Sequence, residues 1–220
     1  MGPVKAIKAM FKWALAEEKV PHDPSRDLTV APPPAGGHHT WTVEEVRQFE
    51  ERHPIGTKAR LALALLLWTG VRRSDVVTLG RQHVRNGWLR FTQQKNRNRK
   101  PVVTQIPILP ELRHIIDESP CGDLNFLVTS TGAPYTLWGF GNWFRDRCVE
   151  AAVPGRAHGL RKAGAATAAE NGATTKQLMA NFGWLSVEEA ETLHAGRRAQ
   201  AHGWRCDGPP HRARATIRGA

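Results

Sequence analysis

The segment from Lys58 to Trp68 places the strongest constraint on the fold. Leucine and alanine occupy most of its positions, so a helix formed here is apolar almost all round. Such a helix is expected to be buried inside a domain. Its longest apolar run, Leu61 to Trp68, is far too short to cross a bilayer, and Thr69-Gly70 ends it. A chain of 220 residues is long enough for one sizeable domain around this helix, or for one domain and a fragment.

Most other segments show helical periodicity or capping signals. Apolar residues recur at helical spacing from Val4 to Leu15, and Thr42 with Glu45 forms a capping box for a helix to about Arg52. A short helix is predicted just after Arg72, and further helices over about 110–117, 137–153, 158–170 and 175–181. After an Asn-Gly turn, a strand is predicted over 88–92 with a partner over 102–108, and 126–128 is a candidate short strand. The predicted fold class is mainly α with a small antiparallel β-sheet. We assign the aromatic residues of the 137–153 helix to the core rather than to a base-stacking surface: Trp138, Phe140, Trp143 and Phe144.

The charge balance indicates the class of partner. Lysine and arginine number 31 against 20 aspartate and glutamate residues, which gives a formal net charge of +11. A chain this basic favours a polyanionic partner. Its three cysteines are scattered and odd in number, which is typical of a reduced, cytoplasmic protein rather than a secreted one. The N-terminus has no signal-peptide pattern, and we expect no membrane attachment.

A compact group of phosphate-binding side chains is predicted at the start of the 158–170 helix. His158 and Arg161 are three residues apart, so they share one face of a helix that begins here. An imidazole beside a guanidinium, close to the N–H groups of a helix start, is suited to holding a phosphate. The alternative is an ordinary capping histidine with a solvated arginine, and these residues alone leave both interpretations open.

Two further basic residues are candidates for the same site. Arg72 follows the Thr69-Gly70 turn, and Asp75 could hold it by an ion pair at the start of the next helix, although such a pair can also be purely structural. Lys95 lies at the end of the first predicted strand, in a basic loop over residues 94–100. Most such loops are solvated or contact phosphates without doing chemistry. Lys95 is the exception, because its position at the strand end is the best fixed.

Together these motifs resemble the catalytic domain of tyrosine recombinases, the phage integrase family. Residues 69–72 with Asp75 are similar to the family's first-arginine motif, and Lys95 sits where the family keeps its β-hairpin lysine. The segment from His158 to Lys162 resembles the family's His-x-x-Arg motif, and Gly183-Trp184 resembles its Gly-His/Trp motif. The similarity covers about residues 38–191.

The resemblance implies a domain organisation. Residues 1–20 are similar to the last helix of the family's N-terminal DNA-clamping domain, most of which is expected to be missing. Residues 21–39 contain three consecutive prolines and two consecutive glycines, which is typical of a linker. The catalytic domain, with the family's helical fold and three-stranded sheet, is expected over residues 40–191, and residues 192–220 form a tail.

The resemblance also implies the chemistry. In the family, a tyrosine attacks a DNA phosphate and forms a 3′-phosphotyrosyl link without a metal or nucleotide cofactor, as type IB topoisomerases do. Arg72 and Arg161 would hold the non-bridging oxygens, where charge builds up in the transition state. Lys95 would protonate the leaving 5′ oxygen, and His158 would assist proton movement. Trp184 would donate its indole N–H to the phosphate.

The nucleophile is where the sequence departs from the family. The resemblance places it at Leu193, and the only tyrosine in the chain, Tyr135, precedes the histidine motif. Back-translated with GC-rich codons and read one base later, the residues from Thr192 onward begin Arg-Tyr-Thr-Arg-Ala-Ala, a typical family ending. We hypothesise that a one-base insertion after Glu191 has put residues 192–220 out of frame.

An out-of-frame tail bears on two other predictions. His202, Cys206 and His211 have loose metal-ligand spacing. We expect no zinc site, because out-of-frame translation of a GC-rich gene scatters such residues. Glycines and the Pro209-Pro210 pair interrupt any helix, so the tail is expected to be disordered. In the family, this segment docks into a neighbouring protomer, so we expect self-association to be weakened.

The sequence therefore predicts a protein that binds double-stranded DNA for site-specific recombination and DNA integration, with catalysis impaired because the tyrosine is absent. The alternative is a non-catalytic DNA-binding protein that occupies recombination sites or interferes with an intact recombinase. A third interpretation is a remnant that folds poorly.

Overall fold

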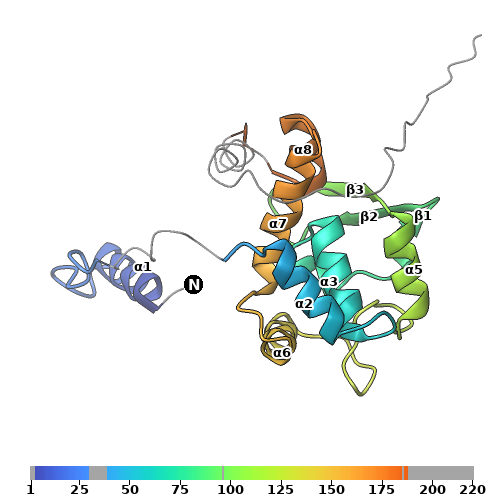
Figure 1. Ribbon diagram of the computed structural model, residues 1–220. Coiled ribbons are helices and arrows are strands. Elements are labelled where there is room, and N and C mark those ends of the chain that lie inside the picture. The colour runs from blue at the N-terminus through green and yellow to red at the C-terminus, as the bar shows by residue number, and fades with distance from the viewer. Residues whose placement is uncertain (1–2, 30–38, 96, 185, 188–220) are drawn as a thin grey trace, which may run out of the picture. The chain divides into compact units, whose positions relative to one another are not determined.

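The computed structural model describes residues 3–29, 39–95, 97–184 and 186–187. Backbone contacts divide the chain into two units, Met1–Gly37 and His38–Ala220. The first unit contains helix α1, Pro3–Ala16 (Figure 1). No residue of α1 is buried, and its apolar Met10 and Trp13 are more than half exposed. Residues 30–38 of the predicted linker lie outside the described residues.

The second unit has the mainly α architecture that the sequence predicts. Its elements, in chain order, are α2 (Val43–Arg52), α3 (Lys58–Thr69), α4 (Arg73–Val76), the 3-10 turn η1 (Arg81–His83), β1 (Val84–Arg85), β2 (Trp88–Thr92), β3 (Val103–Pro107), α5 (Pro110–Glu118), α6 (Leu137–Glu150), α7 (Ala157–Glu170) and α8 (Thr175–Phe182). The capping box of Thr42 and Glu45 opens α2 as predicted. Among the described residues, no helix is long and apolar enough to span a membrane.

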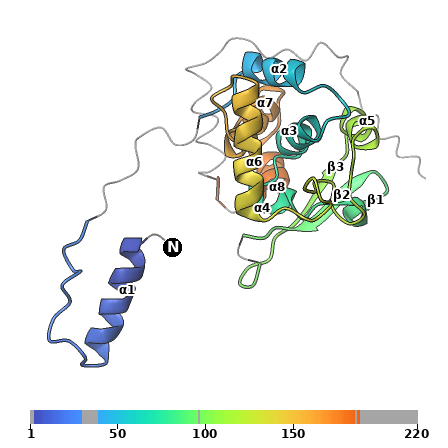
Figure 2. The ribbon, with the colours of Figure 1, turned by 90° about the horizontal axis from the view of Figure 1, so that it is seen from below.

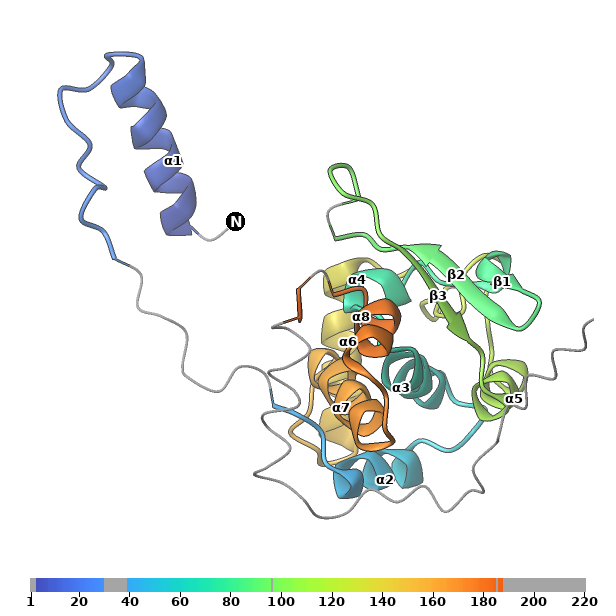
Figure 3. The ribbon, with the colours of Figure 1, turned by 90° about the horizontal axis from the view of Figure 1, so that it is seen from above.

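Helix α3 forms the centre of this unit. Its alanine and leucine residues favour helix, and the Thr57 hydroxyl caps its start by accepting the N–H of Arg60 at 3.2 Å. Nearly every residue from Ala59 to Leu67 is buried, which confirms the prediction from its apolar pattern. Each fully buried leucine contributes about 2 kcal/mol of hydrophobic stabilisation. Figures 2 and 3, which view the ribbon from opposite sides, show α3 enclosed by α2, α5, α6, α7 and the sheet.

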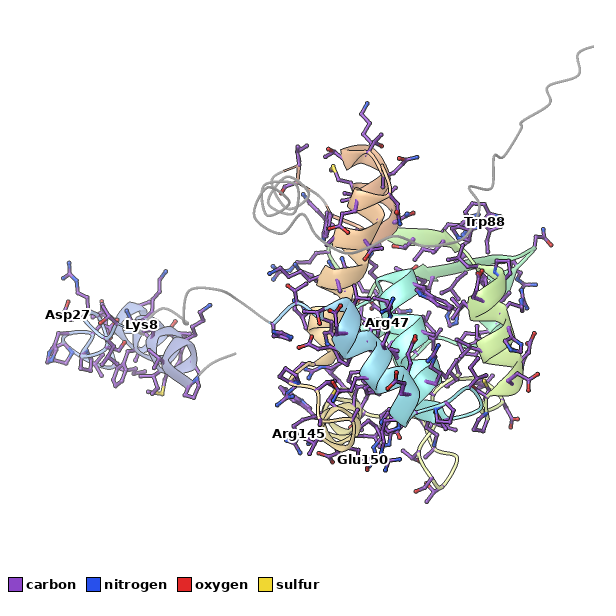
Figure 4. The ribbon with its side chains drawn as sticks, viewed as in Figure 1. Lys8, Asp27, Arg47, Trp88, Arg145 and Glu150 are labelled. Carbon is purple, nitrogen blue, oxygen red and sulfur yellow. The ribbon has the colours of Figure 1, made fainter. Side chains whose placement is uncertain are left out.

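The sheet is a three-stranded antiparallel meander in the order β1-β2-β3. Asn86 and Gly87 join β1 to β2, and both have positive φ, the backbone that a tight two-residue hairpin turn requires. Leu89 and Phe91 of β2 are buried against the helices, whereas Trp88 is 42% exposed (Figure 4). The inner face of the sheet therefore belongs to the core and the outer face is open.

Two local predictions are wrong. Residues 126–128 do not form a strand; Val128 makes only an isolated bridge with Pro134. Trp138 is 73% exposed, although Phe140 and Phe144 of the same helix are fully buried. Two residues correspond to about 200° around a helix, so Trp138 faces away from Phe140. It lies instead against the guanidinium of Arg73, 5.4 Å from the ring centroid.

Candidate active site

Arg161 joins three helices at the centre of the candidate site. It lies in the first turns of α7 and is only 7% exposed. Its two terminal nitrogens donate to the backbone oxygens of Gly70 and Phe182. Gly70 caps the C-terminal end of α3, and Phe182 is the last residue of α8. The buried guanidinium therefore holds the ends of α3 and α8 against the start of α7.

Arg72 is held by a hydrogen bond to the hairpin that β2, β3 and the loop between them form. It precedes α4 as its N-cap residue and is half-buried. Its Nη1 donates to Oε1 of Gln93, whose Nε2 donates in turn to the hydroxyl of Thr104 on β3 at 2.8 Å. The Gln93 side chain is 3% exposed, so this chain of hydrogen bonds is shielded from solvent. We infer that Gln93 orients Arg72.

Gln93 is a site residue that the sequence analysis missed. A signal for it exists, because alternate residues of a strand share one face. Leu89 and Phe91 are the buried residues of β2, so position 93 continues the inward-facing register. A polar residue on the core face of a strand end needs a partner, and Arg72 supplies it.

Asp75 is buried near enough to both arginines to feel their charge. It is 1% exposed, and its Oδ1 accepts the backbone N–H of Gln94 at 2.8 Å. Burial raises the pKa of Asp75, while the Gln94 N–H and the positive charges of Arg72 and Arg161 act to lower it. The anticipated ion pair with Arg72 is not formed, since within the described residues the Arg72 guanidinium bonds to Gln93 instead. Asp75 thus acts on both arginines through its charge.

Trp184 closes the site beside Arg161. Its half-buried ring stacks on Phe182, with centroids 5.1 Å apart and planes at 21°. The guanidinium carbon of Arg161 lies 5.3 Å from the Phe182 centroid and 5.9 Å from that of Trp184. Cation–π attraction of this kind adds about 1 kcal/mol and fixes the plane of the guanidinium.

Lys95 and His158 differ from this cluster in their exposure. Lys95 is exposed, two residues beyond Gln93 in the loop after β2. His158 is the second residue of α7 and is also exposed, so it shares a helix with Arg161 but not its burial. The structure therefore brings together Arg72, Asp75, Arg161 and Trp184.

Gly183 is required by both its backbone and its neighbour. It ends α8 with φ of 57°, and a Cβ added to it would lie 1.9 Å from Nε2 of Gln93. Gly172 also has positive φ, 88°, but its surroundings are open. We predict that Gly183→Ala destabilises the fold by about 2–3 kcal/mol, against about 1 kcal/mol for Gly172→Ala, because only the first adds a clash to the strain. Urea unfolding of the two variants measures the difference. Equal losses would show that Gly183 does not pack on Gln93 as described.

Residues 41–194 match the model of the phage integrase family. The chain belongs to the phage integrase family. No curated protein sequence matches it at a significant level.

Solved integrase structures share the fold. A lambda integrase dimer bound to a COC′ core site has a TM-score of 0.71 and 16% identity, over 92% of this chain and 75% of that one. A Tn1549 transposon integrase in complex with circular intermediate DNA has a TM-score of 0.64 and 17% identity, over 86% and 72% of the two chains. XerA recombinase has a TM-score of 0.62 and 16% identity, over 90% and 75%. The chain spans 61% of a longer lambda integrase chain.

Tyr135, the only tyrosine of this family member, packs at the other end of α3. Its ring contacts Phe140 and Trp143, with centroids 5.8 Å and 5.4 Å away, and Nζ of Lys58 lies 6.0 Å from its centroid. Lys58 begins α3, whereas Gly70, the partner of Arg161, follows its last residue about 18 Å along the axis. Burial raises the pKa of Tyr135, which makes its phenolate harder to form.

The expected nucleophile position, Leu193, lies outside the described residues, as does the whole of the 192–220 tail. The loosely spaced His202, Cys206 and His211 lie there as well. In the part of the chain that the structure describes, no group of three or more histidine, cysteine, aspartate or glutamate side chains could hold a metal ion.

Proposed function

We propose that this member of the phage integrase family binds double-stranded DNA and holds one backbone phosphate between Arg72 and Arg161, as a tyrosine recombinase does in site-specific recombination and integration. The observation that supports this most is the joining of α3, α7, α8 and the hairpin by these two guanidinium groups. Planar guanidinium groups are suited to the paired oxygens of a phosphate.

The electrostatics of the cluster favour an anion. Two permanent positive charges act on one carboxylate, Asp75, so the cluster keeps a net positive charge. Arg161 is almost fully buried, and charges in such surroundings are screened less than charges in water. A phosphate placed beside Arg72, Arg161 and the indole of Trp184 would offset this charge. The same groups would stabilise the extra charge of a phosphoryl transition state.

The remaining roles follow the family pattern. Lys95 would protonate the leaving 5′ oxygen from the hairpin loop, and His158 would assist proton transfer from the start of α7. No cofactor is required, because the arginines supply the charge stabilisation and a tyrosine would supply the covalent step.

The covalent step is the one that this chain does not support. Leu193 stands where the nucleophile is expected, and Tyr135 belongs to the opposite end of α3. We propose that catalysis is impaired, with the one-base insertion after Glu191 as the cause. A non-catalytic DNA-binding protein that occupies recombination sites, or interferes with an intact recombinase, is the second candidate, and it is favoured by a phosphate site that is retained without its nucleophile.

Self-association is proposed from related proteins. Lambda integrase has been crystallised as a dimer on a core site and as a tetramer on a Holliday junction. We propose the same type of assembly here, weakened because the tail lacks an apolar stripe that could fill a partner's groove.

DNA binding is expected to be strongly salt-dependent, because it rests on phosphate contacts. The affinity for a labelled duplex should fall steeply between about 50 and 200 mM salt, by a factor that grows with the number of contacts. Fluorescence anisotropy across this range measures it. Absence of binding at low salt, or an affinity that does not change with salt, would contradict the proposal.

No covalent adduct is expected on a nicked suicide substrate, even at high protein concentration. The reason is that Tyr135 is held in an apolar cluster, with a raised pKa, away from Arg161. A denaturing gel detects any protein–DNA band. A band that persists in the wild type and disappears in Tyr135→Phe would show that Tyr135 is the nucleophile after all.

A further inference from the structure

A hollow lies beside the hairpin and is lined by none of the residues of the arginine cluster. It has a volume of about 480 Å³. Its polar lining comes from the segment between α4 and β1, from β2 and from the loop after β2: Thr78, His83, Arg90, Thr92, Gln94 and Arg97. We call it the hairpin pocket. It adjoins the candidate active site through consecutive residues, since Gln93 bonds to Arg72 and Gln94 lines the pocket.

Two arginines without a carboxylate partner converge on the hairpin pocket. Arg90 and Arg97 are both exposed, and neither side chain forms an ion pair or hydrogen bond within the described residues. Arg60, by contrast, is paired with Glu50 at 2.9 Å, and no aspartate or glutamate lines the pocket. Two uncompensated guanidinium groups around one hollow favour an anion.

The other polar groups add hydrogen-bond donors. Nδ1 of His83 accepts the backbone N–H of Gly80 at 3.2 Å, which leaves the proton of the neutral ring on Nε2, a donor. Burial lowers the pKa of His83, so the ring is neutral at pH 7. The side-chain amide of Gln94 and the hydroxyl of Thr92 complete a donor set suited to phosphate oxygens.

We propose that the hairpin pocket binds a second phosphate of the DNA backbone, in addition to the one held by Arg72 and Arg161. This rests on the proposed function, because duplex DNA presents many phosphates on both strands to any surface it crosses. A free nucleotide fits less well. Of the apolar lining residues, Phe91 is buried and Val103 is aliphatic, so the pocket offers no exposed aromatic face on which a base could stack.

The first test compares two double variants of equal charge. Arg90→Gln with Arg97→Gln removes both guanidinium groups of the hairpin pocket. Arg47→Gln with Arg52→Gln removes two exposed arginines from α2, which lies at the opposite end of the domain from the hairpin (Figures 2 and 3). Both proteins are titrated with one labelled duplex over a range of salt concentrations.

The hairpin variant is expected to bind on the order of 10-fold more weakly at low salt, and the slope of log affinity against log salt should decrease by about one to two. The α2 variant should lose less than about 3-fold. If the two variants lose affinity equally, or the hairpin variant keeps the wild-type slope, the second phosphate site is contradicted.

The second test does not need DNA binding. Inorganic phosphate is titrated into the isotope-labelled protein, and backbone amide signals are followed. The amides of Thr92 and Gln94 should shift saturably in the wild type but not in the hairpin variant. Shifts confined to the Arg161 region, or equal shifts in both proteins, would overturn the pocket. If the wild type binds no DNA while these amides still shift, the proposed function fails and the phosphate pocket stands.

Discussion

Deleting one base from the Thr192 codon is expected to turn a chain that forms no covalent DNA adduct into one that does. If the frame-shift hypothesis holds, the deletion restores a tyrosine at the position of Leu193, where the family resemblance places the nucleophile. The expected gain is several orders of magnitude, since loss of a covalent nucleophile costs about 10⁶-fold in serine proteases. A denaturing gel on a nicked suicide substrate measures it.

Two controls separate the nucleophile from the rest of the tail. The repaired chain with phenylalanine in place of the restored tyrosine should form no adduct. Leu193→Tyr in the unrepaired chain supplies the hydroxyl without the helical tail, and we expect it to form less adduct than the repaired chain. If the repaired chain gains neither an adduct nor, by light scattering, DNA-dependent assembly, the frame-shift hypothesis is wrong.

Replacing Arg161 is expected to have the largest effect on stability. Arg161→Met keeps most of the side-chain volume but leaves the oxygens of Gly70 and Phe182 without their donor, and it removes one of the two positive charges acting on Asp75. We expect a loss of about 3 kcal/mol in the free energy of unfolding. Arg161→Lys should recover only part of it, because an ammonium cannot reproduce the planar fork.

The matched surface control is Arg145→Met, which breaks an exposed ion pair with Asp146 and should cost less than about 1 kcal/mol.

The pH dependence of the stability gives a second readout of the role of Arg161. Burial already raises the pKa of Asp75, and loss of the Arg161 charge raises it further. As pH falls, Asp75 is therefore protonated at a higher pH in Arg161→Met than in the wild type. Protonation removes the negative charge of Asp75 that Arg161 no longer compensates. The difference in the free energy of unfolding between wild type and Arg161→Met should therefore narrow on acidification. If Arg161→Met lowers the free energy of unfolding at neutral pH by less than about 0.5 kcal/mol, the size of a typical surface substitution, the structural role of Arg161 is contradicted.

Local signals in the sequence predict most of the elements. The capping box of Thr42, the glycine stop at Gly70 and the Asn-Gly turn before Trp88 each involve neighbouring residues, so they can be recognised without tertiary information. The exposure of Trp138 also has a local signal. The spacing of Phe140 and Phe144 marks the buried face of α6, and Trp138 lies off it.

The contacts that build the site join residues that are far apart in the sequence, so no local signal marks them. Arg161 bonds to the ends of two helices remote in sequence, and Arg72 bonds to a strand. No periodicity links these positions, so motif resemblance identifies Arg72 and Arg161 without revealing that Gln93 and Phe182 hold them. The partner of Asp75 could not be predicted from the sequence either. Its neighbour Arg72 suggests an ion pair, whereas the fold places the backbone N–H of Gln94 at the Asp75 carboxylate.

The most direct test of the central claim is to observe the two arginines while DNA is bound. Side-chain Nε–H signals of Arg72 and Arg161, assigned with Arg72→Lys and Arg161→Lys, are followed by NMR as a short duplex is added. Both signals should shift together and saturate with the same affinity as the anisotropy titration. Binding that shifts only signals of surface arginines such as Arg47, while those of Arg72 and Arg161 stay unchanged, would show that no DNA phosphate occupies the site.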